Sequence, residues 1–317
     1  MTPVDFHAHL VDPAIYAETQ RWSIFAQTSD PTRSASVIAR MADIDDRVAA
    51  MNKIGVGIQV LSSSLVHQCT YDADPADALR LDRAMNEHIA AAVAARPNRF
   101  RGLGSVPLQA PDLAAKELAR CVKELGLSGV TISTRVGDRE IGEETLKPFW
   151  EQAEALGAVV FIHPAGNHAT RFRKFQLWNS IGQSFEEAMA IASLFYEGVL
   201  DAYPRLKIVV SHGGGYMPYY LGRIARNYIE KPATRANMSK PPIDYVRMLH
   251  YDTCVYDSDT LDDLVRVVGP ERIVIGSDYP VGDITPVEFV RNCARLDTAQ
   301  QEMVLSGNAM RLLSTGL

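Results

Sequence analysis

The sequence is poor in cysteine, and its four cysteines, at positions 69, 121, 254 and 293, form no C-x-x-C pair. In a chain of 317 residues this argues against a disulfide framework and leaves a reducing cytoplasm as the expected location. No run of about 18 apolar residues is present, so no membrane span is predicted. The N-terminus lacks the basic stretch and apolar run of a signal peptide.

Positive charge is also scarce, because 32 basic residues face 38 acidic ones and the net charge is −6. This balance argues against nucleic acid as a partner, although a small anionic substrate remains compatible. The absence of G-x-G-x-x-G and P-loop patterns leaves dinucleotide and NTP binding with little support. Without a G-x-S-x-G nucleophile elbow, the HGGG motif at residues 212–215 is not interpreted as an esterase oxyanion hole.

What the sequence contains is a regular alternation of short β-branched runs and longer helical patterns. Several runs are continuously apolar, as expected of parallel strands covered on both faces. Eight such units favour an α/β fold, a (β/α)8 TIM barrel, in a single domain over residues 1–317. A doubly wound open sheet is the alternative. The expected strands are residues 4–6, 57–62, 101–106, 129–133, 158–162, 207–211, 251–255 and 272–276.

Two stretches interrupt this alternation and are predicted to be long inserted loops. The first lies after the first strand, at about residues 11–44, and the second spans about residues 229–249. Loops of this length usually carry function or form interfaces.

Residues that bind metals stand where three of the expected strands end. His7 and His9 close the first strand, and side chains two apart on a strand share a face. His163 follows the run AVVFI, and Asp278 follows RIVIGS. Each signal is weak alone, but three histidines and one aspartate form a donor set that suits Zn²⁺ or a similar ion.

A further histidine, His212, follows the run KIVVS and precedes three glycines. Glycine lets the backbone turn sharply and lets a ligand approach closely. We predict that His212 is an acid/base beside the ion; a structural histidine in an ordinary strand-to-helix turn is the alternative. His67, after the second expected strand, is a candidate for lining the pocket.

The motifs VDFHAH, FIHPAG, VSHGGG and GSDYP together resemble the metal-dependent decarboxylase branch of the amidohydrolase superfamily. Within it, the α-amino-β-carboxymuconate-ε-semialdehyde decarboxylases are the closest type. The similarity runs from about residue 45 to the C-terminus and leaves 11–44 uncovered. It implies a barrel with one divalent ion, Zn²⁺ in first place and Mn²⁺ as the alternative. The implied ligands are His7, His9, His163 and Asp278.

The resemblance also implies roles for residues around the ion. His212, with Asp278, is expected to carry protons. Arg47 matches the family arginine that meets a substrate carboxylate, and Arg223 is expected to serve the same end across a dimer interface. Two further residues are expected nearby, Asn179 in the pocket and Glu186 supporting the metal centre without binding the ion.

These expectations converge on a carbon–carbon lyase, a non-oxidative decarboxylase of a small unsaturated or aromatic hydroxy or amino acid, expected as a homodimer. The segment ISTR, residues 132–135, has no lysine where dinuclear hydrolases of the superfamily carry a modified one, which favours a single ion. A mononuclear hydrolase or hydratase, acting on a lactone or related ring-cleavage product, is the alternative. A non-catalytic metal-binding protein is the third reading.

Overall fold

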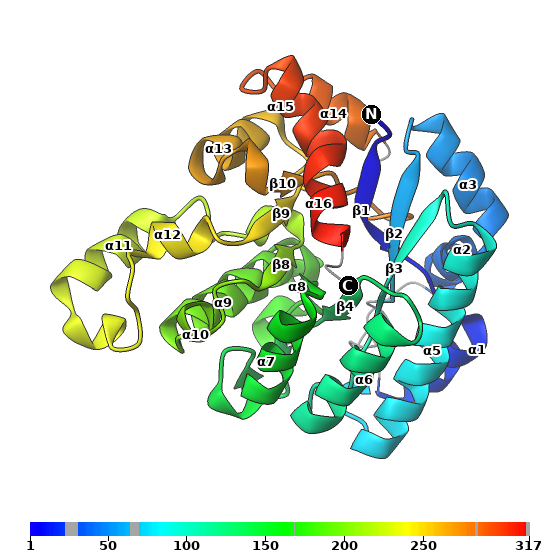
Figure 1. Ribbon diagram of the computed structural model, residues 1–317, viewed down its shortest axis with the longest axis horizontal. Coiled ribbons are helices and arrows are strands. Elements are labelled where there is room, and N and C mark those ends of the chain that lie inside the picture. The colour runs from blue at the N-terminus through cyan, green and yellow to red at the C-terminus, as the bar shows by residue number, and fades with distance from the viewer. Residues whose placement is uncertain (23–30, 64–69, 168, 283–284, 315–317) are drawn as a thin grey trace.

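The computed structural model describes residues 1–22, 31–63, 70–167, 169–282 and 285–314. Over these residues, eight parallel strands form a barrel ringed by helices (Figure 1). Hydrogen bonds from Phe6 N to Ile275 O (2.8 Å) and from His9 N to Tyr279 O (2.9 Å) join its last and first strands. The expected (β/α)8 barrel is therefore confirmed, and the open sheet is excluded.

The strands follow one another around the barrel in chain order. They are β1 (Val4–His9), β2 (Ile58–Ser62), β3 (Phe100–Gly104), β4 (Gly129–Ile132), β7 (Val159–Ile162), β8 (Lys207–Val210), β9 (His250–Asp252) and β10 (Ile273–Val274). A short antiparallel hairpin, β5 (Arg135–Val136) and β6 (Arg139–Glu140), follows β4.

Helices begin and end at the residues that local chemistry favours. α7 starts with Pro148 in its first turn and stops at Gly157, which adopts a left-handed φ of 58°. The α-helices are α1 (Pro13–Thr19), α2 (Pro31–Ala42), α3 (Ile44–Lys53), α5 (Pro75–Ala95), α6 (Pro111–Lys123), α7 (Lys147–Leu156), α8 (Leu177–Ser180), α9 (Gly182–Tyr196), α10 (Val199–Ala202), α11 (Leu221–Glu230), α12 (Pro242–Val246), α13 (Ser258–Val268), α14 (Pro286–Arg291), α15 (Thr298–Glu302) and α16 (Asn308–Leu313). Shorter 3-10 turns include η1 (Gln20–Trp22), η3 (Glu144–Leu146), η4 (Thr170–Phe172), η5 (His212–Gly214), η6 (Pro232–Arg235) and η7 (Pro270–Arg272), and a π-helical turn spans Met303–Gly307.

The prediction of long inserted loops was wrong for the described parts of both stretches. The first contains α1, η1 and α2, and the second contains η6 and α12. The sequence did carry a signal for the start of α1, namely an aspartate followed by proline. Asp12 is the N-cap residue, accepting hydrogen bonds from Ala14 N (2.8 Å) and Ile15 N (3.0 Å), and Pro13 is the first helical residue. In Figure 1, α11 and the turn after it extend away from the barrel.

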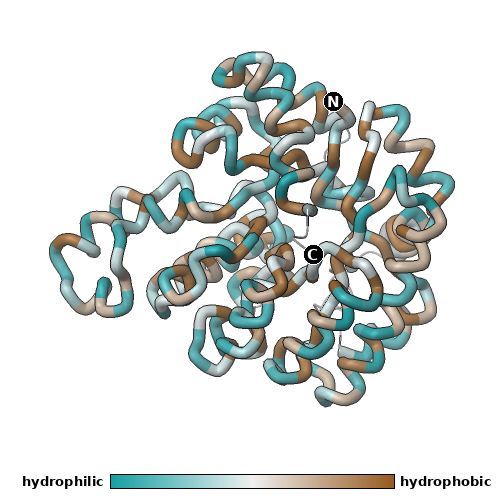
Figure 2. The backbone as a smooth tube through the Cα atoms, in the orientation of Figure 1, coloured by the Kyte–Doolittle hydropathy of each residue, from teal (hydrophilic) through white to brown (hydrophobic). Residues whose placement is uncertain are grey.

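The hydrophobic core has two parts. A large outer cluster lies between the strands and the surrounding helices, and apolar residues recur along these elements (Figure 2). A smaller inner cluster fills the barrel itself and includes Phe6, Phe161 and Val209. Leu312 and Leu313 of α16 belong to this inner cluster, so the C-terminal helix packs against the barrel interior. No helix of the described segments is long and apolar enough to cross a membrane.

A buried carboxyl group between α5 and β3 makes stability depend on pH. Burial raises the pKa of Asp82 from 3.8 to about 8, and Glu117 adds to the shift. Between about pH 4 and pH 8 the folded protein keeps a proton on Asp82 that the unfolded chain releases, so this group lowers stability as pH rises.

We therefore expect Asp82→Asn to lose less unfolding free energy than the wild type between pH 5 and pH 8. The asparagine stays neutral in both states over this range, whereas the unfolded wild-type chain is stabilised by releasing the Asp82 proton that the fold retains. Urea unfolding curves of both proteins at the two pH values measure the difference. An equal loss in the two proteins would show that Asp82 ionises as freely in the fold as in the unfolded chain.

Candidate metal centre

The four predicted ligands converge at the C-terminal ends of the barrel strands. His7 and His9 lie on β1, His163 follows β7, and Asp278 follows β10. Their ligand atoms all lie within 4.8 Å of one another. His9 Nε2 is 2.8 Å and His7 Nε2 is 3.2 Å from the same oxygen, Asp278 Oδ1. Three imidazoles and one carboxylate at this spacing surround a point that one divalent ion can occupy.

An irregularity in β1 allows its histidines to face the centre. The pairing of β1 with β2 shifts register between Asp5 and Ala8. As a result, both Phe6 and His7 contact Phe161 inside the barrel, with ring centroids 6.0 and 5.1 Å away. A strictly alternating strand would place these two neighbours on opposite faces. Along β1, Phe6 therefore packs in the barrel core, and His7, the next residue, reaches the ligand cluster.

One buried side chain, Asp252, and one exposed side chain, Tyr256, orient the ligands. Asp252, on β9, lies 2.6 Å through Oδ2 from His7 Nδ1, which directs His7 Nε2 toward the other ligands. Cys254 Sγ lies 3.6 Å from the same Nδ1. On the other side, the Tyr256 hydroxyl donates to Asp278 Oδ2 at 3.4 Å, so the carboxylate presents Oδ1 to the histidines.

The ligands fit a divalent ion by burial and protonation as well as by donor type. His7 Nε2 is buried and makes no hydrogen bond to the described residues. Burial, then the nearby histidines, hold the pKa of His163 well below its usual value. Burial opposes ionisation of Asp278, but His7 outweighs it and the pKa of Asp278 is held well below its usual range. Metal binding requires these deprotonated forms.

His7 behaves differently from the other two. Burial disfavours its charged form, but the adjacent Asp278 and Asp252 carboxylates outweigh burial and raise the pKa of His7 to about 10. The metal-free centre therefore holds a proton on this ring, and an ion that binds His7 Nε2 replaces that proton.

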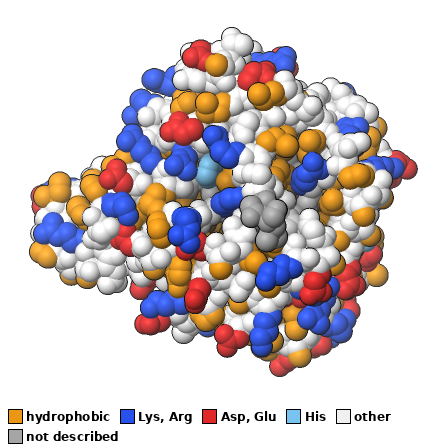
Figure 3. Space-filling view, viewed as in Figure 1, with side chains coloured by type: hydrophobic (Ala, Val, Ile, Leu, Met, Phe, Trp, Pro, Cys, Tyr) orange, Lys and Arg blue, Asp and Glu red, His pale blue; other side chains and the backbone are white. Residues whose placement is uncertain are grey.

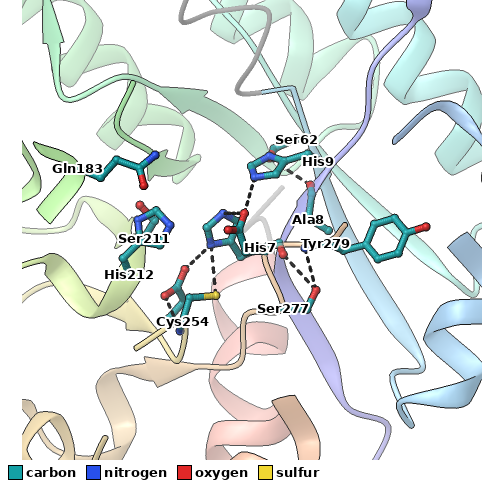
Figure 4. Close-up of polar contacts among 12 residues, drawn as sticks. His7, Ala8, His9, Ser62, Gln183, Ser211, His212, Cys254, Ser277 and Tyr279 are labelled. Atoms are coloured by element: carbon teal, nitrogen blue, oxygen red, sulfur yellow. Dashed lines mark hydrogen bonds and ion pairs between the residues drawn. The ribbon is translucent and has the colours of Figure 1, made fainter. Parts of the chain in front are cut away.

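His212 lies directly beside the ligands. Its ring centroid is 5.3 Å from that of His7 and 5.2 Å from that of His163, and Figure 4 shows His9, His7 and His212 next to one another. His212 Nδ1 lies 2.6 Å from Oε1 of the fully buried Glu187, on α9. Burial disfavours the imidazolium, but Glu187 outweighs it and raises the pKa of His212. The other nitrogen, Nε2, remains available for proton transfer.

The three glycines after His212 allow α9 and β9 to approach this turn. A Cβ on Gly214 would lie 2.6 Å from the ring of Tyr251, and one on Gly215 would lie 2.2 Å from Ser184 O. His212 and Asp278 themselves adopt positive φ angles of 49° and 52°, which is unfavourable for residues with a Cβ. Strained backbone held in place by packing is a common property of functional sites.

Arg47 lies beneath the centre and is fully buried. Its guanidinium donates to the backbone carbonyls of His9 and Met41, and to Gln59 Oε1 at 2.8 Å. Burial lowers its pKa to about 10. In this arrangement Arg47 braces the strand that carries two ligands, and the sequence-based role in binding a substrate carboxylate stays a prediction.

Replacing Arg47 by methionine is expected to lower the free energy of unfolding by roughly 2–4 kcal/mol, because two backbone carbonyls and a buried amide lose their donor. Chemical denaturation measures this loss, and metal content is expected to fall with it. A fully stable, metal-loaded variant with a raised KM for carboxylic acids would instead show that Arg47 binds the substrate carboxylate.

The remaining predicted residues lie in different places. Glu186 accepts from Asn167 Nδ2 (2.7 Å) and lies 3.2 Å from Arg135 Nε, whereas the contact with His212 comes from its neighbour Glu187. Asn179 is exposed on α8, and Arg223 is exposed on α11. His67 lies outside the described residues.

The likeness of this chain to known proteins agrees with the geometry. A family model described as amidohydrolase matches residues 4–315. The chain belongs to the amidohydrolase family. It is 36% identical over 276 residues to the 2-amino-3-carboxymuconate-6-semialdehyde decarboxylase of Dictyostelium discoideum, over 86% of this chain and 76% of the relative.

Solved structures of decarboxylases resemble this amidohydrolase over nearly their whole length. A 5-carboxyvanillate decarboxylase from Sphingomonas paucimobilis matches with a TM-score of 0.89 and 28% identity, over 99% of both chains. A dihydroxybenzoic acid decarboxylase from Polaromonas sp., with bound manganese and the inhibitor 2-nitroresorcinol, matches with a TM-score of 0.87 and 27% identity, over 98% of this chain and 96% of the other. The expected decarboxylase branch of the superfamily is thus confirmed.

Two functional candidates of this amidohydrolase were missed from the sequence, Asp252 and Glu187. Asp252 ends the observed strand β9, a position comparable to that of Asp278, but the expected strand 251–255 placed it second and so hid this signal. Glu187 follows Glu186 in a helical segment, and only the direction of each side chain separates their roles.

Proposed function

We propose that the protein is a metal-dependent non-oxidative decarboxylase of a small unsaturated or aromatic carboxylic acid. The observation that carries this proposal is the pairing of a buried three-histidine, one-aspartate ligand set with the Glu187–His212 pair beside it. Relatives of the chain are decarboxylases, including those of 2-amino-3-carboxymuconate 6-semialdehyde and of gamma-resorcylate.

The ligand set His7, His9, His163 and Asp278 would hold one divalent ion. Such an ion would act as a Lewis acid: it would bind oxygen atoms of the substrate acid and stabilise the negative charge that develops as CO2 leaves. Zn²⁺ is the ion that the donor set favours, while manganese is bound in the related dihydroxybenzoic acid decarboxylase, so Mn²⁺ is the alternative to test first.

His212 is proposed as the proton carrier. In the reaction the carbon–carbon bond to the carboxyl group breaks, its electron pair stays on the substrate carbon, and CO2 departs. That carbon then takes a proton, which His212 Nε2 delivers while Nδ1 stays on Glu187. Asp278 is the alternative carrier, although its Oδ1 already faces His7 and His9.

The test is release of CO2 by protein loaded with Zn²⁺ or Mn²⁺ and offered hydroxybenzoates and muconate-type acids. We expect release that requires the ion and disappears after chelation. Activity of fully metal-free protein would contradict the mechanism. No CO2 release from any of these acids, combined with hydrolysis of lactones, would favour a hydrolase on the same scaffold.

A homodimer is also proposed, with contacts through α9 and α11. Large apolar side chains are exposed on or next to these helices: Phe185 (42%), Tyr220 (67%) and Ile229 (70%). In Figure 3 apolar and charged side chains mix over the protruding segment. Exposed apolar surface of this kind marks interaction sites. Arg223 lies on the same helix and would reach the partner, as the sequence suggested; the cytoplasmic location also stays a prediction.

Light scattering on the purified protein is expected to give the mass of two chains. Tyr220→Ser combined with Ile229→Ser is expected to shift this mass toward one chain, because the exposed apolar area on α11 is removed. A wild-type mass of one chain at micromolar concentration would contradict the dimer.

A further inference from the structure

Three polar side chains form a row along one face of α8 and α9. Asn179, Gln183 and Glu187 are spaced by four residues, which makes them neighbours on a helix surface. Hydrogen bonds from Ile181 N to Leu177 O (3.1 Å) and from Phe185 N to Ile181 O (3.0 Å) continue the helical pattern across the junction. Asn179 is exposed, Gln183 is half-buried and Glu187 is fully buried. The row therefore leads from the surface to the partner of His212.

Gln183 lies on α9 one helical turn before Glu187, the residue that contacts His212. The first turn of α9 packs on the glycine turn after His212, since Tyr216 N donates to Ser184 O at 3.4 Å. A Cβ on Gly215 would lie 2.2 Å from the same oxygen. Figure 4 shows the Gln183 side chain reaching from α9 toward His212. Gln183 therefore lies on the face of α9 that carries Glu187, the partner of the predicted proton carrier.

The Gln183 amide is hydrogen-bonded through its oxygen to Asn179. Asn179 Nδ2 donates to Gln183 Oε1 at 2.7 Å, which fixes the oxygen toward the surface row. Gln183 Nε2 carries two N–H groups, and neither makes a hydrogen bond to another described residue. A half-buried donor next to an active centre is suited to bind an oxygen of a substrate.

We propose that Gln183 is a specificity-determining residue that donates a hydrogen bond from Nε2 to an oxygen substituent of the substrate acid. Asn179 acts as a positioning residue that keeps the amide in this orientation. The proposal rests on the proposed function. It names the substrate class more narrowly: acids that carry a hydroxyl, carbonyl or second carboxylate group on the side facing α9.

The physical basis is the cost of an unmatched polar group. A site built to hydrogen-bond a substrate oxygen discriminates against an analogue without it, because its donor is left unpaired on binding. We expect kcat/KM to fall about tenfold when that oxygen is missing, as for the loss of one hydrogen bond. Because the contact is made to bound substrate before and during the reaction, the change should appear mainly in KM.

The test compares pairs of acids that differ by one oxygen substituent, such as 2,6-dihydroxybenzoate and 2-hydroxybenzoate. The pairs are chosen from acids that the metal-loaded wild type decarboxylates. Gln183→Leu and Gln183→Glu are expected to abolish the preference for the more oxygenated acid. Gln152→Leu, which changes a half-buried glutamine on α7, is the matched control and should keep the preference.

Gln183→Glu is the decisive variant, because its carboxylate still accepts from Asn179 but donates nothing in its ionised form. A merely structural role for Gln183 would leave this variant with wild-type KM values. An unchanged preference in Gln183→Glu, with full metal content, would overturn the inference while leaving the decarboxylase intact. A wild type that releases CO2 from no acid at all would overturn the proposed function and this inference with it.

Discussion

His212→Ala is expected to lower kcat by about 10²–10⁴-fold while the protein keeps its metal, because the variant loses a positioned proton carrier but none of the four ligands. The separation follows from geometry, since His212 is bound through Nδ1 to Glu187 and stands beside the ligand cluster. Steady-state CO2 release and metal analysis of the same sample measure the two effects. Loss of the ion in this variant would make His212 a ligand.

Glu187→Gln is the matched variant for this experiment. It keeps the size of the side chain and an acceptor for His212 Nδ1, but it removes the negative charge that raises the pKa of His212. The imidazolium form is then lost at a lower pH than in the wild type, so the limb of the pH–rate profile that reports this proton should move to lower pH. An unchanged pH–rate profile would show that Glu187 does not set the pKa of the group that carries the proton.

His163→Ala is expected to remove both the bound ion and the activity. His163 comes from β7, and its loss leaves three ligand side chains around the point that four enclose. Asp252→Asn offers a graded comparison, because it weakens the orientation of His7 without removing a ligand. Losses of about 10–100-fold in metal affinity are typical when such a supporting group is changed.

Both variants are best compared by titrating metal-free protein with Mn²⁺ and Zn²⁺ while following occupancy and CO2 release together. Activity should track occupancy in Asp252→Asn, so that excess metal restores most of it. An active His163→Ala protein would show that this histidine is not needed to hold the ion.

The sequence was sufficient to predict the barrel because its signal repeats. Eight apolar runs alternate with helical patterns, and each predicted strand overlaps an observed one. The four ligands were also accessible, since the ends of parallel strands meet at one end of a barrel and the residue types are distinctive. Here local pattern and global fold agree.

What the sequence did not reveal depends on direction and packing. Glu186 and Glu187 differ by one position, and only the rotation of α9 against the His212 turn decides which one meets the imidazole. Arg47 lies in a helix start rich in aspartate, which suggested solvent or substrate, yet tertiary contacts bury it against the carbonyl of His9. The helix signal Asp12–Pro13 was present, but the polar surroundings obscured it.

The apolar filling of the barrel also determines how molecules reach the metal centre. Phe161 lies directly beneath the histidines, with its ring centroid 5.1 Å from that of His7, and the side chains below it continue to Leu312 and Leu313 of α16. Among the described residues, this apolar cluster fills the barrel on the side of the ligands that faces α16. A substrate of the proposed reaction would therefore reach the ligands from the opposite end of the barrel, where the Tyr256 hydroxyl contacts Asp278 Oδ2.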